Sequence, residues 1–210
     1  MSPDIIKVAE AEFPTRWGLF RIMGFQGIFP GHTASPGVSE KRKEEAVALV
    51  MGDIHANPPL VRIHSQCLTG DVFGSLRCDC RQQLEMALRM ISDAGTGVLI
   101  YEQQEGRGIG LMAKLQAYEL QDQGLDTVEA NEQLGFKPDC REYNLSVEVM
   151  QALGLKEVRL LSNNPEKVSA VEKAGIKVIE RVPAEVVPSQ YSERYLETKR
   201  DKMGHLFNSR

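Results

Sequence analysis

The sequence has little of what marks an exported, membrane-embedded or nucleic-acid-coating protein. Its formal net charge is −4 and only 6% of its residues are aromatic, so it lacks the net basic surface by which nonspecific nucleic-acid binders release counterions. No apolar run approaches the roughly 20 residues needed to cross a bilayer. Residues 1–13 contain no apolar segment flanked by positive charge and do not resemble a signal peptide. We therefore expect a cytoplasmic protein.

Cysteine is also scarce, with four residues in the chain. Because a cytoplasmic compartment keeps thiols reduced, metal binding or catalysis explains these cysteines better than disulfides do. The chain has no repeat or low-complexity tract, and 42% of its residues are apolar and 26% charged, as in an ordinary globular protein. Its length predicts one domain, over residues 1–183, with a C-terminal tail over 184–210.

Strands and helices are expected to alternate through the middle of the chain. Apolar residues recur at i, i+3, i+4 and i+7 in a segment from Gln82 to Gly95, which is typical of a helix. A second helical face runs from Leu111 to Tyr118, before Gly124. The predicted strands are Ala46–Met51, Leu60–His64, Val98–Tyr101, Val158–Leu161 and Lys177–Val182. This alternation predicts a three-layer α/β fold, in which helices cover both faces of a mixed sheet.

The last strand–helix–strand unit carries helix-end signals. Asn164 is a favourable N-cap, Pro165 suits the first helical position, and Gly175 follows the last turn. This pattern predicts a βαβ unit.

Three segments lack a regular pattern. The segment 24–45 is rich in glycine, proline, serine and charge, so it is predicted to be a mobile loop that follows a short N-terminal strand region. Cys67–Cys80 is also predicted to be a loop. Tyr191–His205 is predicted to be a helical or loosely attached tail.

Cys67, Cys78 and Cys80 form a candidate zinc site within this second loop. Thiolates are soft ligands that suit zinc, and three protein ligands leave a fourth position for a water whose pKa falls to about 7. On a regular helix, residues two apart point roughly 200° away from each other. Cys78 and Cys80 can therefore converge only at a turn or at a helix N-terminus.

Two other interpretations of these cysteines stay open. His64 could be a fourth ligand, which would make a closed structural site. Alternatively, the three thiols could be small buried side chains without a metal. Cys140 lies far along the chain and is expected to be an ordinary thiol.

A glycine-rich turn at Gly106–Gly110 lies between a predicted strand and a predicted helix. Such a turn exposes backbone N–H groups that can bind an anion. Arg107 suits a phosphate and Glu105 could accept paired N–H donors, although a solvated turn with a salt bridge is the simpler alternative. The spacing is GxGxG rather than GxGxxG, which disfavours a dinucleotide site, even with Asp126 near the distance of a ribose contact. No Walker A motif is present.

Several motifs in order resemble the GTP cyclohydrolase II family. They are VRIHSQCLTGD at 61–71, SLRCDC at 75–80, QEGRGIGL at 104–111, DTVEAN at 126–131, NNPEK at 163–167 and KMGHL at 202–206. The resemblance covers about Leu60 to Val182. It implies a zinc-dependent hydrolase that opens the imidazole ring of GTP at C8, releases formate and pyrophosphate, and serves riboflavin or a related pathway. The product would be 2,5-diamino-6-(5-phosphoribosylamino)pyrimidin-4-one.

The resemblance also implies roles for individual residues. Cys67, Cys78 and Cys80 would hold one zinc ion, and Tyr118 would assist ring opening. The enzyme would be a homodimer. Independently of the resemblance, phosphoryl-transfer chemistry in general leads us to expect Mg²⁺ with the triphosphate. The residues implied to surround GTP are Arg62, Ile63, His64, Ser65, Gln66, Gln83, Glu105, Gly106, Arg107, Thr127, Ser162 and Lys167.

Arg141 matches an arginine implied to attack the α-phosphate, with Asp139 as its base or orienting partner. An arginine stays protonated because its pKa exceeds about 12. A bidentate phosphate clamp is therefore the alternative role. Without the resemblance, the segment 139–141 would be interpreted as a surface loop.

Four positions depart from the family pattern. Gln66 stands where glutamate is usual and Arg81 where glycine is usual, so both change the charge beside a predicted zinc ligand. Cys140 replaces an acidic residue, and Ser162 replaces threonine but keeps the hydroxyl. Together with His64, the changes at Gln66 and Arg81 leave open a noncatalytic nucleotide-binding module with structural zinc. A separate alternative is a variant of the enzyme that retains the formyl group.

Overall fold

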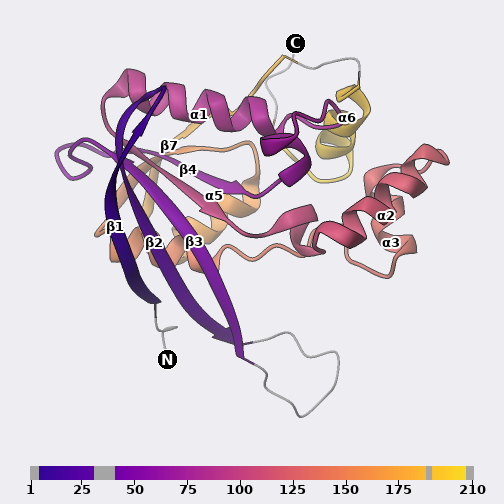
Figure 1. The fold of residues 1–210 in the computed structure, drawn as a ribbon, viewed down its shortest axis with the longest axis horizontal. Helices are drawn as coiled ribbons and strands as arrows, with labels where there is room; N and C mark the ends of the chain where they lie inside the picture. The colour runs from indigo at the N-terminus through magenta and orange to yellow at the C-terminus, as the bar shows by residue number, and fades with distance from the viewer. Residues whose placement is uncertain (1–4, 31–40, 188–190, 207–210) are drawn as a thin grey trace.

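The computed structural model describes residues 5–30, 41–187 and 191–206. In this part of the chain, strands form one seven-stranded mixed sheet in the order β1-β2-β3-β5-β4-β6-β7 (Figure 1). The neighbours from β1 to β5 are antiparallel, whereas β5, β4, β6 and β7 are parallel. The strands are β1 (Ile5–Thr15), β2 (Gly18–Pro30), β3 (Lys41–Met51), β4 (Leu60–Ser65), β5 (Gly97–Glu102), β6 (Glu157–Leu161) and β7 (Lys177–Val182).

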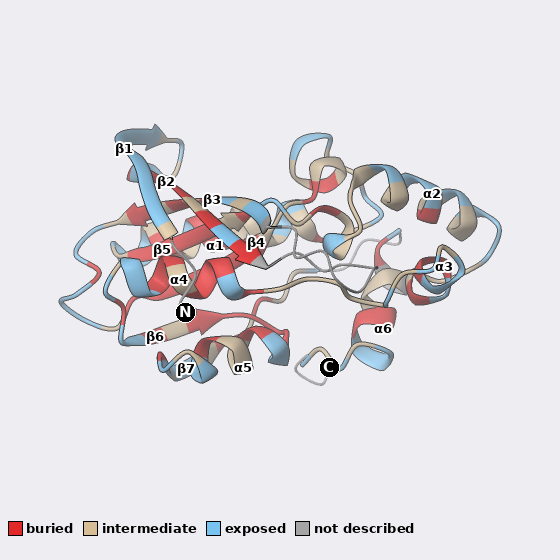
Figure 2. Ribbon diagram, turned by 90° about the horizontal axis from the view of Figure 1, so that it is seen from below, coloured by how far each residue is buried: buried red, intermediate tan, exposed pale blue. Residues whose placement is uncertain are grey.

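Helices cover both faces of the sheet, which confirms the predicted three-layer α/β class. Ile91 of α1 packs with Leu99 on one face, and Met150 of α4 and Val171 of α5 pack with Ile100 on the other. The central strands are buried, whereas β1 is largely exposed (Figure 2). The helices are η1 (Leu68–Val72, π), α1 (Cys80–Ala94), η2 (Glu105–Gly108, 3-10), α2 (Leu111–Asp122), α3 (Thr127–Gln133), α4 (Asn144–Ala152), α5 (Pro165–Lys173) and α6 (Glu193–Asp201).

None of the helices in the described ranges is both long and apolar enough to span a membrane. The predicted central strands and helices are confirmed within a few residues at their ends. At α5, the Asn164 side chain accepts a hydrogen bond from the backbone N–H of Glu166, and Pro165 occupies the first turn. Gly175 follows the helix with a φ of 81°, as the βαβ pattern predicted.

The prediction of a loop at 24–45 is wrong for residues 24–30 and 41–45. Residues 31–40 lie outside the described ranges. Residues 24–30 belong to β2 and residues 41–45 to β3, and these two strands pair antiparallel. Met23, Phe25 and Phe29 are buried at alternate positions of β2. This period-two pattern is a strand signal, but the intervening glycines obscured it, and the N-terminal strands are long rather than short.

Two other predicted irregular segments contain helical structure. Residues 68–72 form the π-helical turn η1 within the predicted cysteine loop. The helical alternative for the tail is confirmed by α6, and this helix is packed rather than loose, since Thr198 and Lys199 are buried.

Leu160 provides a test of the sheet core, since its side chain is fully buried in β6. We expect Leu160→Ala to lower the free energy of unfolding by about 2–5 kcal/mol, because truncation leaves a cavity. The same change at Leu19, which is 59% exposed, should cost within about 0.5 kcal/mol. Urea denaturation measures both, and equal losses would contradict this placement of the core.

Candidate functional site

The site begins at β4, where alternate side chains point to opposite faces of the sheet. Val61 and Ile63 lie in the core with α4 and α5. Arg62 and His64 therefore point to the face that α1 covers. Arg62 donates hydrogen bonds to the carbonyl of Leu161 at 3.0 Å and to the side chain of Gln83 on α1 at 2.6 Å.

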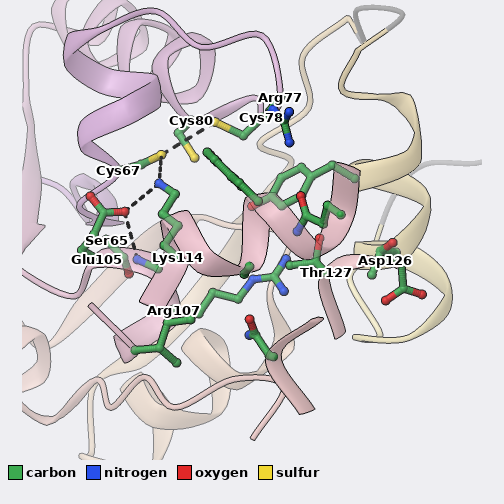
Figure 3. Close-up of a pocket in the computed structure, with 18 of the residues that line it drawn as sticks. Ser65, Cys67, Arg77, Cys78, Cys80, Glu105, Arg107, Lys114, Asp126 and Thr127 are labelled. Carbon is green, nitrogen blue, oxygen red and sulfur yellow. Dashed lines mark hydrogen bonds and ion pairs between the residues drawn. The ribbon is translucent and has the colours of Figure 1, made fainter. Parts of the chain in front are cut away.

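The three predicted metal ligands converge. The sulfur atoms of Cys67, Cys78 and Cys80 all lie within 4.8 Å of one another, and those of Cys67 and Cys78 are 3.7 Å apart. Figure 3 shows the three side chains pointing toward a common point. Cys80 is the first residue of α1, so the helix N-terminus lets Cys78 and Cys80 converge in spite of their spacing.

Gly70 makes room for this convergence. A Cβ atom at Gly70 would lie 2.8 Å from the Cys78 sulfur and 3.1 Å from the Cys67 sulfur. The turn η1 thus passes over the thiol cluster at a distance that only glycine permits. The close approach of three soft ligand atoms in a half-buried space fits a thiophilic cation such as zinc.

The thiols and Lys114 strongly influence each other's ionisation. Hydrogen bonds from Cys78 and Cys80 lower the pKa of the Cys67 thiol, and Lys114 lowers it further. The Lys114 ammonium donates to the Cys67 sulfur at 3.1 Å and to Glu105 at 2.7 Å. Burial lowers the pKa of Lys114, but Glu105 and Cys67 outweigh burial and raise it above its usual value.

The Glu105 carboxylate holds the segment that carries Cys67 in place. One carboxylate oxygen accepts from Lys114 and from the backbone N–H of Gly106 at 3.0 Å, and the other accepts from the backbone N–H of Leu68 at 2.6 Å. Glu105 is buried. The carboxylate therefore connects the glycine-rich turn to the segment that carries Cys67.

A second carboxylate, Asp71, orients Cys67 from the other side. It accepts from the backbone N–H of Cys67 at 3.0 Å, from the Tyr101 hydroxyl at 2.8 Å, and it lies 3.2 Å from Nε2 of His64. Burial lowers the pKa of His64, and its ring stacks on Tyr101. Among the described residues His64 is not part of the thiol cluster, so the geometry disfavours it as a fourth ligand.

Tyr118 lies beside the thiols. Its hydroxyl is 3.1 Å from the Thr69 hydroxyl, which in turn is 3.7 Å from the Cys67 sulfur. Burial raises the pKa of Tyr118, so the phenol stays protonated near neutral pH and can donate a proton or a hydrogen bond.

The glycine-rich turn packs against the segment 139–141. A Cβ at Gly108 would lie 2.9 Å from the carbonyl oxygen of Cys140, whose N–H donates to the carbonyl of Arg107 at 3.0 Å. Arg107 has a φ of 61°, the only positive value at a non-glycine residue in the described ranges. Such strain persists where the surrounding structure imposes it, often at functional sites.

Asp126 has a structural role at the start of α3. It is the N-cap of α3, and its side chain accepts from the N–H groups of Val128 and Glu129. It also pairs with Lys202.

Arg141 and Asp139 form a bidentate pair. Nε of Arg141 donates to one Asp139 oxygen at 3.0 Å, and a terminal guanidinium nitrogen donates to the other at 2.5 Å. Burial lowers the pKa of Arg141, but Tyr143 and Asp139 outweigh it and raise the pKa above its usual value. Burial also raises the pKa of Asp139, while Arg141 lowers it to a net value below the usual range. The pair is therefore ionised, so Arg141 is a cation.

Two adjoining cavities collect the predicted residues. We call the first, of about 330 Å³, the thiol cavity and the second, of about 70 Å³, the arginine cavity. The predicted residues in the thiol cavity are Ser65, Gln66, Cys67, Cys78, Cys80, Glu105, Gly106, Arg107, Tyr118, Thr127 and Arg141. Those in the arginine cavity are Arg62, His64, Ser65, Cys80, Gln83, Arg107, Arg141, Ser162 and Lys167.

Two predicted residues line neither cavity. Ile63 is buried in the core and offers only its carbonyl, which accepts from Lys167 at 2.9 Å. Asp139 contacts Arg141 from outside the cavity walls. The guanidinium of Arg81, one of the departures from the family pattern, is exposed and pairs with Glu85.

Sequence reasoning missed several residues of the site. Lys114 lies four positions before Tyr118, on the same face of α2, and this spacing was a usable signal. The sequence assigned no role to the others, although all but Tyr195 and Lys199 lie in the motifs at 61–71, 75–80 and 202–206, because tertiary contacts bring them to the site. They are Thr69, Gly70, Asp71, Asp79, Tyr195, Lys199 and His205.

Known proteins match the chain along nearly its whole length. A family model described as GTP cyclohydrolase II matches residues 6–183. The GTP cyclohydrolase-2 of Histophilus somni strain 2336 is 54% identical over 200 residues, which are 95% of this chain and 87% of that protein. The GTP cyclohydrolase-2 of Escherichia coli strain S88 is 52% identical over 203 residues, 96% of this chain and 97% of that protein.

A longer protein matches as well. The riboflavin biosynthesis protein RibBA of Chlorobium phaeovibrioides is 50% identical over 203 residues, which are 96% of this chain but 47% of that protein. The matched region thus also occurs as one part of a larger chain. The chain described here belongs to the GTP cyclohydrolase II family.

Proposed function

We propose that this enzyme hydrolyses GTP at C8 of the guanine, releasing formate and pyrophosphate to give 2,5-diamino-6-(5-phosphoribosylamino)pyrimidin-4-one. One observation carries the proposal. The thiol cavity and the arginine cavity share five wall residues: Ser65, Cys80, Arg107, Arg141 and Tyr195. A base beside the thiols and phosphates beside the arginines therefore fit a single nucleotide.

Cys67, Cys78 and Cys80 would hold the zinc ion on which the family depends. Zinc bound there supplies a water of lowered pKa, about 7, as a nucleophile. Lys114 donates a hydrogen bond to the Cys67 sulfur, which limits the negative charge that three thiolates would build up. Asp71 and Glu105 keep the loop that carries Cys67 in place.

The walls of the thiol cavity would orient the guanine. A carboxylate has about four acceptor positions, and three of those on Glu105 are occupied by Leu68, Gly106 and Lys114. One acceptor position remains for an N–H of the guanine edge. Gln66, Gly106 and Thr127 line the same space and offer further polar contacts.

The arginine cavity would bind the triphosphate. The Ser65 hydroxyl, Nε of Arg62 and both terminal nitrogens of Arg107 are buried without a hydrogen-bond partner among the described residues. A phosphate oxygen would satisfy each of them. Gln83, Ser162 and Lys167 complete these contacts, and His64 adds a buried neutral imidazole.

No carboxylate lines the arginine cavity within the described part of the chain. Mg²⁺ that accompanies GTP would therefore be held by phosphate oxygens and water, as is usual for this ion. The product would enter riboflavin formation, in keeping with the name of the Chlorobium relative. We also propose that the enzyme is a homodimer that acts on GTP without contacting nucleic acid or a membrane.

The metal site is tested by Cys78→Ser, which replaces a soft ligand by a poor one. We expect zinc content to fall well below one ion per chain and formate release from GTP to fall more than about a hundredfold. Elemental analysis and a formate assay measure the two effects. Arg81→Gln, which changes a solvent-facing neighbour, is the matched control. Wild-type turnover in the serine variant would refute the proposal.

Arg141 is proposed to be a phosphate clamp rather than a nucleophile, because its pair with Asp139 keeps it charged. Arg141→Lys should keep measurable turnover while raising KM for GTP about tenfold, since lysine retains the charge but loses bidentate geometry. Steady-state kinetics measures both parameters. Complete loss of turnover with unchanged GTP binding, or a covalent guanylyl adduct on Arg141, would instead support nucleophilic attack.

A variant of Tyr118 tests whether ring opening is followed by release of formate. Tyr118→Phe removes the hydroxyl beside Thr69 and should reduce formate release at least tenfold, since a positioned proton donor contributes about 10²–10⁴ in rate. Product mass spectrometry distinguishes the released pyrimidine from a product that keeps the formyl group. A retained formyl group in the wild-type product would establish the alternative function.

A further inference from the structure

The C-terminal helix α6 forms part of the arginine cavity. Tyr195 and Lys199 from α6, and His205 just after it, line this cavity together with Arg62 and Lys167. Lys199 is buried, and the N–H of Leu206 donates to the carbonyl of Asn163 at 2.8 Å. Figure 1 shows α6 beside the end of α1 that carries the cysteines. The segment 191–206 is therefore a wall of the site.

The cavity holds more positive than negative charge. Five basic side chains line it, and within the described ranges only two of them have a carboxylate partner, Arg141 with Asp139 and Lys199 with Asp79. Arg62, Arg107 and Lys167 have none. Unpaired charges away from water are costly, so this cavity is built for a ligand with several negative charges.

Lys199 fastens α6 to the rest of the site. Its ammonium lies 2.7 Å from one oxygen of Asp79, and the other oxygen accepts from Gln83, which also bonds Arg62. Asp79 lies between two of the cysteines and is the N-cap of α1. One chain of contacts thus runs from α6 to an arginine of the cavity.

Tyr195 and His205 act on the cavity directly. The Arg107 guanidinium lies over the Tyr195 ring at 5.4 Å, which holds this cation toward the cavity. Burial, followed by the cations Lys199, Arg141, Arg107 and Lys167, lowers the pKa of His205 to about 3. Its imidazole is therefore neutral and can donate one N–H.

We propose that the segment 191–206 completes the triphosphate site: His205 is a further phosphate-binding residue, and Lys199 and Tyr195 are positioning residues that hold the segment and Arg107 against the phosphates. This inference rests on the proposed function, since it assigns residues to the same site. It extends the site to a segment that the sequence placed outside the domain.

The test is a calorimetric titration of the zinc-loaded full chain with inorganic tripolyphosphate and, separately, with guanosine. His205→Phe keeps a ring but loses the donor, and Lys199→Gln loses the ion pair with Asp79. Each should weaken tripolyphosphate binding about tenfold, the usual effect of one charge-assisted hydrogen bond. Guanosine binding should stay within about twofold.

His205→Gln and Lys199→Arg should restore most of the affinity, because they return the donor and the charge. This rescue separates binding from a merely structural role. Arg200→Gln is the matched control, since it removes one positive charge from an exposed position of the same helix, and it should bind like the wild type. In turnover, His205→Phe and Lys199→Gln should each raise KM for GTP more than they lower kcat.

Wild-type tripolyphosphate affinity in both His205→Phe and Lys199→Gln would overturn the inference, as would an equal loss of guanosine binding. Failure of the proposed function looks different: tripolyphosphate would bind and the variants would weaken it, but the wild type would release no formate from GTP.

Discussion

The site depends on strand alternation at β4, the central parallel strand. Val61 and Ile63 are held in the core by α4 and α5, so Arg62 and His64 must face α1. The chain then leaves the sheet at Ser65 and reaches Cys67. Asp71 accepts a hydrogen bond from the backbone N–H of Cys67, and Glu105 accepts one from that of Leu68. A shift of one residue in the pairing of β4 would exchange the two sets of side chains. The core and the site are thus specified by the same register.

Electrostatics connects the two halves of the site. Thiols gather on one side, where three thiolates would repel each other without a cation. Cationic side chains gather on the other, with fewer carboxylates than they need for pairing. In each half a ligand of the opposite sign would balance this charge, and its binding would also stabilise the folded protein. The proposed metal ion and polyanionic nucleotide would meet these two needs at adjoining walls.

Close backbone approaches set the geometry between these halves. Gly70 lets η1 pass over the thiols, and Gly108 lets the glycine-rich turn contact the segment that carries Arg141. The same turn holds Arg107 in a left-handed conformation. The glycine-rich turn looks like a dinucleotide fingerprint. Its Gly108 instead permits a close backbone contact with Cys140.

The sequence by itself determined the α/β class, the caps of α5, the cysteine trio and the family resemblance, because each depends on local periodicity or on short motifs. It did not determine the β2–β3 pairing, since glycines and charges at 24–45 hid a buried alternation that only the neighbouring strands make evident. Nor could it place Asp71, Lys114 or α6, whose roles depend on contacts between distant segments. The Lys199–Asp79 pair spans 120 positions, and only tertiary packing brings such groups together because no local pattern encodes their distance.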